Sequence, residues 1–158
     1  MQFAQWHNSI GSHLRGVVTM LFVVVCAISC SNEQNIVAMT DVNLTEWDKQ
    51  ITVSLLSEQT ESEGDLTIVL HVNRNFKTKQ VELEIVSMTA DSLRYTERIT
   101  SEPQIVWPAA TAQSVDVEIP YRHRVMMRKA GPYSYTITPL SPLRGVESAG
   151  MSFKTENR

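Results

Sequence analysis

Apolar and polar side chains alternate along most of the chain after residue 50, and this period of two constrains the fold more than any other feature. Side chains two apart on an extended strand share a face, so each run buries one face and leaves the other to water. No segment keeps the 3.6-residue period of an amphipathic helix. The sequence therefore predicts half-buried antiparallel strands. The clearest runs are 51–55, 66–72, 81–85, 115–119 and 133–137, and weaker ones are 93–99, 105–107, 125–127 and 151–154.

Turn-forming residues separate these runs. Gly64, Asn73, Asn75 and Gly131 stand between them, and Gly and Asn tolerate the positive φ that tight turns need. The polar run 57–64 predicts a plain hairpin loop. About seven to nine short strands with turns between them predict an all-β fold, a single antiparallel β-sandwich of the immunoglobulin-like or the jelly-roll type.

The N-terminus has the pattern of a bacterial lipoprotein. An apolar run over 16–29 ends in Ser29 and Cys30, and a polar stretch follows. A lipoprotein signal peptidase cuts before a cysteine that follows a small residue, after a diacylglycerol has been added to the thiol. We therefore expect cleavage between Ser29 and Cys30, with Cys30 as the lipidated first residue and the membrane as a partner through that lipid.

The apolar run of fourteen residues is shorter than the roughly 20 that a transmembrane helix needs. The alternatives to cleavage are an uncleaved anchor helix and a buried strand, although a buried strand would not end in a small residue, a cysteine and a polar stretch. The expected organisation is a signal peptide over 1–29, a lipidated N-terminus and tether over 30–43, and a β-sandwich domain over 44–158. Cys26 would leave with the signal peptide, so the stability of the mature domain must come from its core and not from disulfides.

Charge indicates little about partners. The whole chain carries a formal charge of −3, and loss of Arg15 leaves 13 basic against 17 acidic side chains. We expect no nucleic acid among the partners of such a domain. The one basic concentration runs from Arg122 to Lys129, and either it meets anionic headgroups or glycans or it is an ordinary solvated strand end.

Motifs for catalysis are missing from the sequence. It contains no GxSxG, HExxH, P-loop, Rossmann or CxxC pattern, and the mature chain has two histidines, His71 and His123. We expect both to be ordinary strand histidines. Glu82 and Glu84 lie two apart on one strand face, side by side, whereas glycoside hydrolysis needs carboxyls that face each other across a cleft. We expect no catalytic residue, no metal site and no cofactor.

Aromatic and basic side chains supply the candidate binding surface. Trp47 and Trp107 stand at predicted strand edges, and Arg122 and Arg124 belong to the basic concentration. Indole rings can stack on sugars or on a partner's side chains, and they can equally close the open end of a sandwich. Both interpretations stay open at this point.

The C-terminal third resembles the end of the gliding-motility lipoprotein H family, in which a Gly-x-Tyr-x-aromatic-x-Ile strand precedes a Leu-x-Gly motif and a last apolar strand. Residues 130–137 and 143–153 carry the likeness. Trp47 and the stretch 73–76 occupy further family positions. Ser148-Ala149 replaces the family's Asp-Val, and Pro139-Leu140 replaces its Met-Arg, so the chain resembles a divergent member. The matching residues are Gly131, Tyr133, Tyr135, Ile137, Leu143, Gly145 and Gly150.

The resemblance implies a β-sandwich lipoprotein without enzymatic activity that assists gliding motility or a related secretion machine, with other envelope proteins as partners. A glycan- or surface-binding module is the alternative function. Bacteria that have this family often mark surface-exposed lipoproteins with acidic residues directly after the lipidated cysteine, whereas Glu33 is the one acidic residue in 31–34. We therefore expect an outer-membrane lipoprotein that faces the periplasm.

Overall fold

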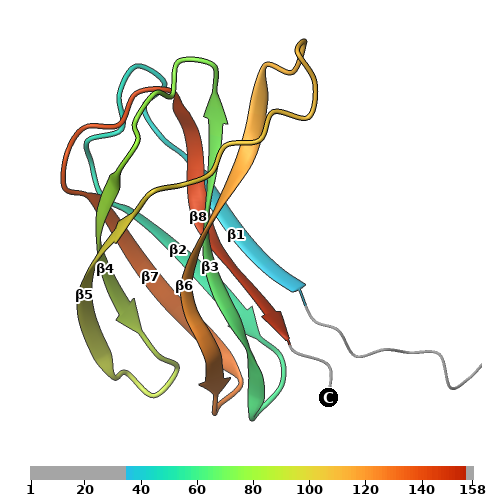
Figure 1. Ribbon diagram of the computed structural model, residues 1–158. Helices are drawn as coiled ribbons and strands as arrows, with labels where there is room; N and C mark the ends of the chain where they lie inside the picture. The colour runs from blue at the N-terminus through green and yellow to red at the C-terminus, as the bar shows by residue number, and fades with distance from the viewer. Residues whose placement is uncertain (1–34, 156–158) are drawn as a thin grey trace, which may run out of the picture. The chain divides into compact units, whose positions relative to one another are not determined.

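Eight strands form in residues 35–155, the part of the chain that the computed structural model describes, and they pair into two antiparallel sheets of four strands each (Figure 1). One sheet has the order β1-β8-β3-β6 and the other β2-β7-β4-β5. The strands are β1 (Asn35–Asp41), β2 (Ile51–Ser57), β3 (Ser62–Asn73), β4 (Val81–Met88), β5 (Arg94–Ser101), β6 (Ser114–Met127), β7 (Gly131–Pro139) and β8 (Val146–Thr155). The described residues contain no helix with the length and hydropathy to cross a membrane.

The strand pairing identifies the sandwich as a jelly roll. β1 pairs with β8, β2 with β7, β3 with β6 and β4 with β5. This is the pattern of one long antiparallel ribbon that rolls up, so that alternate pairs fall into opposite sheets. Two further pairings, of β3 with β8 and of β4 with β7, complete the sheets. The predicted β-sandwich is therefore confirmed, and its strand order is that of the jelly-roll alternative.

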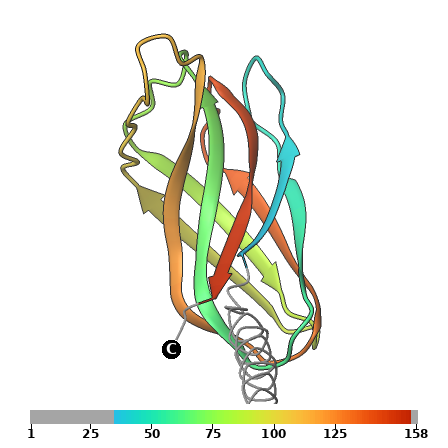
Figure 2. The same cartoon turned by 90° about the vertical axis from the view of Figure 1, so that its right-hand side faces the viewer.

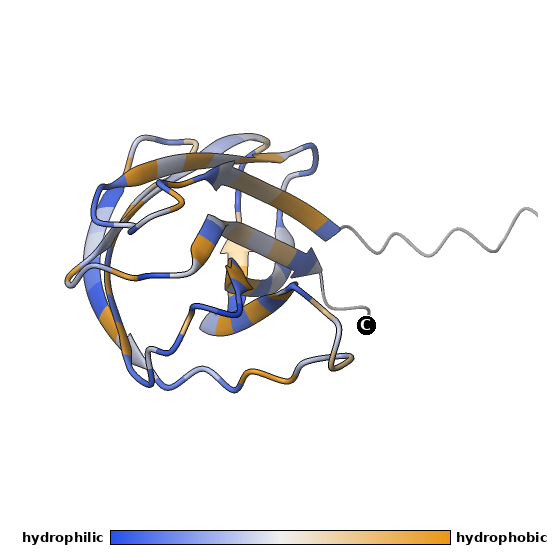
Figure 3. Ribbon diagram, turned by 90° about the horizontal axis from the view of Figure 1, so that it is seen from above, coloured by the Kyte–Doolittle hydropathy of each residue, from blue (hydrophilic) through white to orange (hydrophobic). Residues whose placement is uncertain are grey.

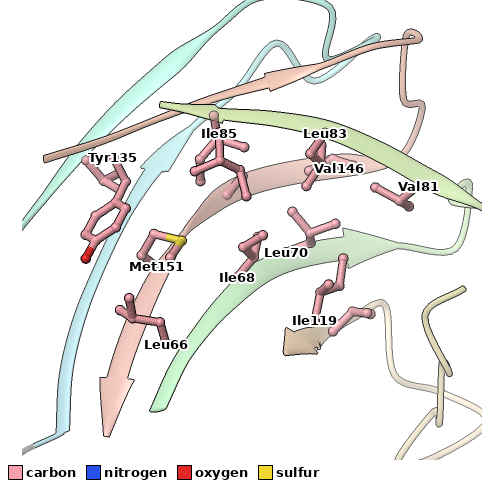
Figure 4. Packing of buried hydrophobic residues seen from close by; sticks show 14 of the residues in the cluster. Leu66, Ile68, Leu70, Val81, Leu83, Ile85, Ile119, Tyr135, Val146 and Met151 are labelled. Atoms are coloured by element: carbon pink, nitrogen blue, oxygen red, sulfur yellow. The ribbon is translucent and has the colours of Figure 1, made fainter. Parts of the chain in front are cut away.

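The core lies between the two sheets and follows from the alternation. Hydrophobic and hydrophilic bands alternate along the strands in Figure 3. In Figure 4, Leu66, Ile68 and Leu70 of one sheet face Leu83 and Ile85 of the other. All five side chains are buried. The five clearest alternating runs of the sequence all lie in strands, because their apolar positions supply these inner faces.

The weaker predictions have mixed outcomes. The runs 93–99, 125–127 and 151–154 fall in or beside β5, β6 and β8. The run 105–107 does not form a strand; it lies in the connection between β5 and β6. The predicted hairpin loop over 57–64 is also wrong. β2 and β3 belong to different sheets, so the connection crosses from one sheet to the other.

The predicted tether over 30–43 is wrong for residues 35–41, which form β1 and pair with β8 along their whole length. The inward positions Ile36, Ala38 and Thr40 are half-buried, whereas Val37 and Met39 are exposed. Alanine and threonine at inward positions give a weak apolar period, and pairing with β8 places this strand in the sheet. The β-sandwich domain thus includes residues well before residue 44.

The strand directions define two ends of the sandwich. β1 starts at what we call the proximal end, where Asn35 pairs with Lys154, and the connections 58–61, 89–93 and 128–130 lie at the same end. Figures 1 and 2 both show these three connections at the bottom of the domain. The connections 42–50, 74–80, 102–113 and 140–145 lie at the opposite end, which we call the distal end.

Candidate functional site

Ser29 and Cys30, the predicted cleavage and lipidation positions, lie outside the described residues, so cleavage and lipidation stay predictions. The structure contributes the position of the first described strand, β1. Residues 31–34 alone separate Cys30 from β1, which starts at Asn35. At most four residues, and not the expected thirteen, therefore lie between Cys30 and the first strand.

Trp47 is a core residue and not a binding residue, and this corrects the candidate surface. Its side chain is 1% exposed, and its indole Nε1 donates a hydrogen bond to the carbonyl oxygen of Lys49 at 2.7 Å. Its backbone pairs with Leu143 through hydrogen bonds of 2.8 and 2.9 Å. The ring closes the distal end of the sandwich. A buried indole has one polar group, its N–H, and a hydrogen bond to a backbone carbonyl satisfies that group.

Trp107 remains half-buried in the connection between β5 and β6. The guanidinium of Arg74 stacks on its ring, with Cζ 3.9 Å from the ring centroid. The same guanidinium donates hydrogen bonds of 2.8–3.0 Å to the carbonyl oxygens of Ala109, Ala110 and Ala112. Arg74 thus fixes the loop and occupies one face of the indole.

Arg122 of β6 links this edge strand to β5, the edge strand of the other sheet, through an ion pair. A bulge opposite Leu66 breaks the register of β6, and a bulge redirects the side chains beside it. Arg122 donates from Nη2 to Glu97 at 2.6 Å and from Nε at 3.1 Å, and the Tyr121 hydroxyl donates to the same carboxylate oxygen at 2.6 Å. One carboxylate therefore joins the two sheets at this edge.

The electrostatics of this cluster follow from its hydrogen bonds and burial. The Arg122 hydrogen bond, followed by that of Tyr121, lowers the pKa of Glu97 below its ordinary value. Burial, with a further contribution from Glu97, raises the pKa of Tyr121 to about 12. Glu97 also raises the pKa of Arg122. The carboxylate is thus held charged and the phenol neutral around neutral pH.

Arg124 is paired on the other side of β6. Its Nε donates to Glu63 at 2.9 Å, and its backbone N–H donates to Asp65 at 2.9 Å. Arg124 has a φ of 54°, which is uncommon for a residue other than glycine. The backbone hydrogen bond from Arg124, followed by the side-chain contact with His123, lowers the pKa of Asp65.

The four predicted surface residues do not come together. Trp47 and Trp107 belong to the distal half, whereas Arg122 and Arg124 lie on β6 toward the proximal end. Both arginines also pair with carboxylates of the same domain, and this pairing weakens the attraction that they could exert on an anionic ligand. Trp107 is therefore the one predicted surface residue whose environment still suits a binding role.

A polar cluster that the sequence did not indicate lies on the outer face of the β1-β8-β3-β6 sheet. His71 Nδ1 is 2.6 Å from Asp116 Oδ1, and its Nε2 is 3.6 Å from Glu147 Oε2. Asn73 donates to the second oxygen of Glu147 at 2.9 Å. The three strands bring these residues together through their register, which sequence alternation cannot reveal.

This cluster is a network of surface polar contacts that His71, Asn73, Asp116 and Glu147 make with one another. Both ring nitrogens of His71 face carboxylates, so neither is directed at a hydroxyl or thiol that it could activate. Within residues 35–155 no group of three or more His, Cys, Asp or Glu side chains is placed to hold a metal ion. Glu84, one of the two neighbouring glutamates on β4, pairs with Arg98 across the strands at 2.9 Å.

Comparisons with known proteins found no family model, no curated protein and no solved structure that matches this chain. The resemblance to the gliding-motility lipoprotein H family therefore stays a prediction. The structure does show what the resembling residues do. Tyr133, Tyr135 and Leu143 are buried in the core, and Gly145 has a φ of 79° beside the backbone of Phe76. These four residues therefore contribute to the packing and the backbone course of the fold.

Proposed function

We propose that this protein is a lipoprotein of the bacterial cell envelope, held at a membrane by a diacylglycerol on Cys30. The observation that carries the proposal is the order of three features along the chain. An apolar run ends in Ser29 and Cys30, four polar or charged residues follow, and the β-sandwich starts at Asn35. A signal peptide, a lipidated cysteine and an adjacent folded domain are the parts of a membrane-anchored module.

We propose further that the domain is non-enzymatic and serves as an accessory of gliding motility or a related secretion machine. The polar clusters support the first part, because Glu97, Asp65 and His71 contact partners that hold them in structural networks. The resemblance in residues 130–153 supports the second part. Other envelope proteins are then the expected partners, and the outer membrane, on its periplasmic side, is the expected location.

Two cysteine substitutions test the anchor. Cys30→Ser removes the thiol that takes the lipid, so we expect the mature N-terminus to lose its acyl mass and the protein to leave the membrane fraction. Cys26→Ser is the matched control, because Cys26 lies in the same apolar run before the cleavage position, and this variant should be processed and acylated normally. Mass spectrometry of the N-terminal peptide is the measurement. A native protein that starts at Met1 and is soluble would contradict the proposal.

Co-purification from detergent extracts tests the accessory role. We expect stable envelope proteins to accompany the acylated chain, and deletion of the gene to impair motility or secretion. The alternative, a glycan-binding module, is favoured by one observation, the half-buried Trp107 with Arg74 on one ring face. Retention on envelope polysaccharide without protein partners, lost in Trp107→Ala, would support the alternative and overturn the accessory role.

A further inference from the structure

The length of chain between Cys30 and β1 limits how far the domain can lie from a membrane. Residues 31–34 separate the two, and an extended chain covers at most about 3.6 Å per residue, so the Cα atoms of Cys30 and Asn35 can be at most about 18 Å apart. A tether over the whole of 30–43 would have allowed a much greater separation.

The strands of the proximal end extend beyond the start of β1. Asn35 pairs with Lys154, and Lys154 pairs with Asp65 of β3, so these three residues lie at one level of the sheet. β3 starts three residues before Asp65, at Ser62, which pairs with Met127 of β6. Three strand residues span about 10 Å. Even with residues 31–34 fully extended, the proximal connections would lie within about 8 Å of the level of Cys30.

Exposed apolar side chains gather at this end. The ten large hydrophobic side chains that are exposed in residues 35–155 include five that lie within two residues of a strand end at the proximal end. Their exposed fractions range from 45% to 58%, and the five are Leu56, Met88, Leu93, Tyr95 and Met126. This end also carries three basic side chains, Arg94, Arg128 and Lys129, and three acidic ones, Glu58, Glu61 and Asp91. Long basic side chains beside apolar ones suit a surface at the boundary of water and lipid.

The connections that present these side chains are held by specific contacts. The Thr89 hydroxyl accepts a hydrogen bond from the Leu93 backbone N–H at 3.1 Å, which closes the turn between β4 and β5. The Tyr133 hydroxyl donates to the Lys129 carbonyl oxygen at 3.0 Å and accepts from its N–H at 3.2 Å. A Cβ at Gly131 would lie 3.3 Å from the Cβ of Ala90, so the two connections touch. The exposed apolar side chains thus extend from connections that are packed and hydrogen-bonded.

We propose that the proximal end rests in the headgroup layer of the phospholipid bilayer that holds the acyl chains of Cys30. The short connecting segment brings this end to the membrane, and its apolar tips enter the interface while the distal end points away. The inference rests on the proposed lipidation of Cys30. It adds an orientation: the distal loops, with Trp107, are the part of the domain that faces other envelope components.

Single introduced cysteines test this orientation in the full acylated protein. Cys30 is acylated and Cys26 is removed, so an introduced cysteine is the one free thiol of the mature chain. Leu93→Cys places a label at the proximal end, and Leu140→Cys, an exposed leucine of the distal end, is the matched control. The labelled proteins are reconstituted in vesicles of phosphatidylethanolamine and phosphatidylglycerol, and quenching by aqueous iodide and by headgroup-region nitroxide lipids is measured.

We expect the label at 93 to be several-fold less accessible to iodide than the label at 140, and to be quenched by the nitroxide lipids. Met126→Cys, on a different strand of the proximal end, should behave like Leu93→Cys. Equal accessibility of the labels at both ends, in protein whose N-terminal peptide carries the acyl mass, would overturn the orientation and leave the proposed function standing. An N-terminal peptide without acyl mass would overturn both.

Discussion

Trp47 and Trp107 both stand at predicted strand edges in the sequence, and they have different environments in the structure. Trp47 lies in the core and pairs through its backbone with Leu143, whereas Trp107 lies in a loop under the guanidinium of Arg74. Both interpretations of an edge tryptophan, core closure and surface exposure, therefore occur in one molecule. Local sequence cannot separate them, because burial depends on which strands lie across the sandwich.

Truncation of each tryptophan should reflect this difference. We expect Trp47→Ala to lower the free energy of unfolding by about 3–5 kcal/mol, because it leaves a cavity among buried side chains. Trp107→Ala should cost clearly less, since the half-buried ring leaves no closed cavity. Urea unfolding followed by circular dichroism is the measurement. Equal losses in the two variants would contradict the assignment of Trp47 to the core.

Glu97 should make the stability of the domain depend on pH on the acidic side. Its folded pKa lies below its ordinary value of 4.5, so its contribution is present above that value and is lost as pH falls through the folded pKa. Glu97→Gln should therefore be less stable than the wild type at pH 7, and the difference should shrink below about pH 4. Urea unfolding across this pH range measures it. A difference that stays constant down to about pH 2 would rule out the carboxylate as its source.

Tyr121 should make the stability of the domain depend on pH at alkaline pH as well. Burial and Glu97 raise its pKa to about 12 from the ordinary value of 10.0, so the stability it contributes is present below pH 10 and is lost as pH rises through 12. We expect absorbance titration of the phenolate to resolve a tyrosine that ionises near pH 12, and this step should be absent in Tyr121→Phe. An unchanged titration curve in that variant would contradict the assignment.

At the scale of single elements, β1 shows how pairing creates a strand that propensity hardly indicates. Its inward side chains are small or polar in two of three positions, and its backbone lies directly against β8. Gly150 makes this approach possible, because a Cβ there would clash with the carbonyl oxygen of Ala38. A glycine in a strand often marks such a close backbone approach.

Gly150→Ala should therefore displace β1 from the sheet. We expect a loss of about 1–3 kcal/mol in the free energy of unfolding, because the added methyl group overpacks a backbone contact. Hydrogen exchange should rise in residues 35–41 more than in β3. Ser152→Ala is the control on the same strand, because it removes only the hydrogen bond to the Asn35 side chain. Uniform exchange in Gly150→Ala would argue against a local effect.

The connection between β2 and β3 shows that a local sequence does not predict whether two consecutive strands share a sheet. A polar run between two alternating strands has the same appearance whether it joins neighbours in one sheet or crosses between sheets. Ser57 pairs with Gly131, and Ser62 pairs with Met127, so the two strands flank the run in different sheets. Among the described strands, β4 and β5 are the one consecutive pair that lies side by side in a sheet.

At the scale of the whole molecule, the rolled ribbon separates the two ends of the domain by the length of its strands. A thiol at the distal end lies away from the proposed membrane contact, so its labelling by a reagent outside the cell reports where the protein is located. Ser141→Cys places a thiol in the exposed distal connection between β7 and β8. We expect a membrane-impermeant maleimide to leave this thiol unlabelled in intact cells and to label it after the outer membrane is permeabilised. Labelling in intact cells would place the domain at the cell surface.

The sequence by itself determined the class of the fold and its inner faces. Side chains two apart on a strand share a face, so the apolar positions of 66–72 and 81–85 identify core residues without any knowledge of neighbours. The lipoprotein pattern around Cys30 is equally local, because a peptidase reads a short linear segment. Both predictions therefore depend only on the order of residues along a short stretch of the chain.

Tertiary structure decided which strands are neighbours and which side chains meet. The pairing of β1 with β8, the Glu97 bridge between β5 and β6, and the contact of His71 with Asp116 and Glu147 all join residues far apart in the chain. Register and sheet order set these contacts, and both result from the packing of the whole core. That packing also places the four residues of the candidate surface apart from one another. The alternation of a strand predicts which face of the sheet a residue occupies, but it does not predict which residues of other strands lie beside it.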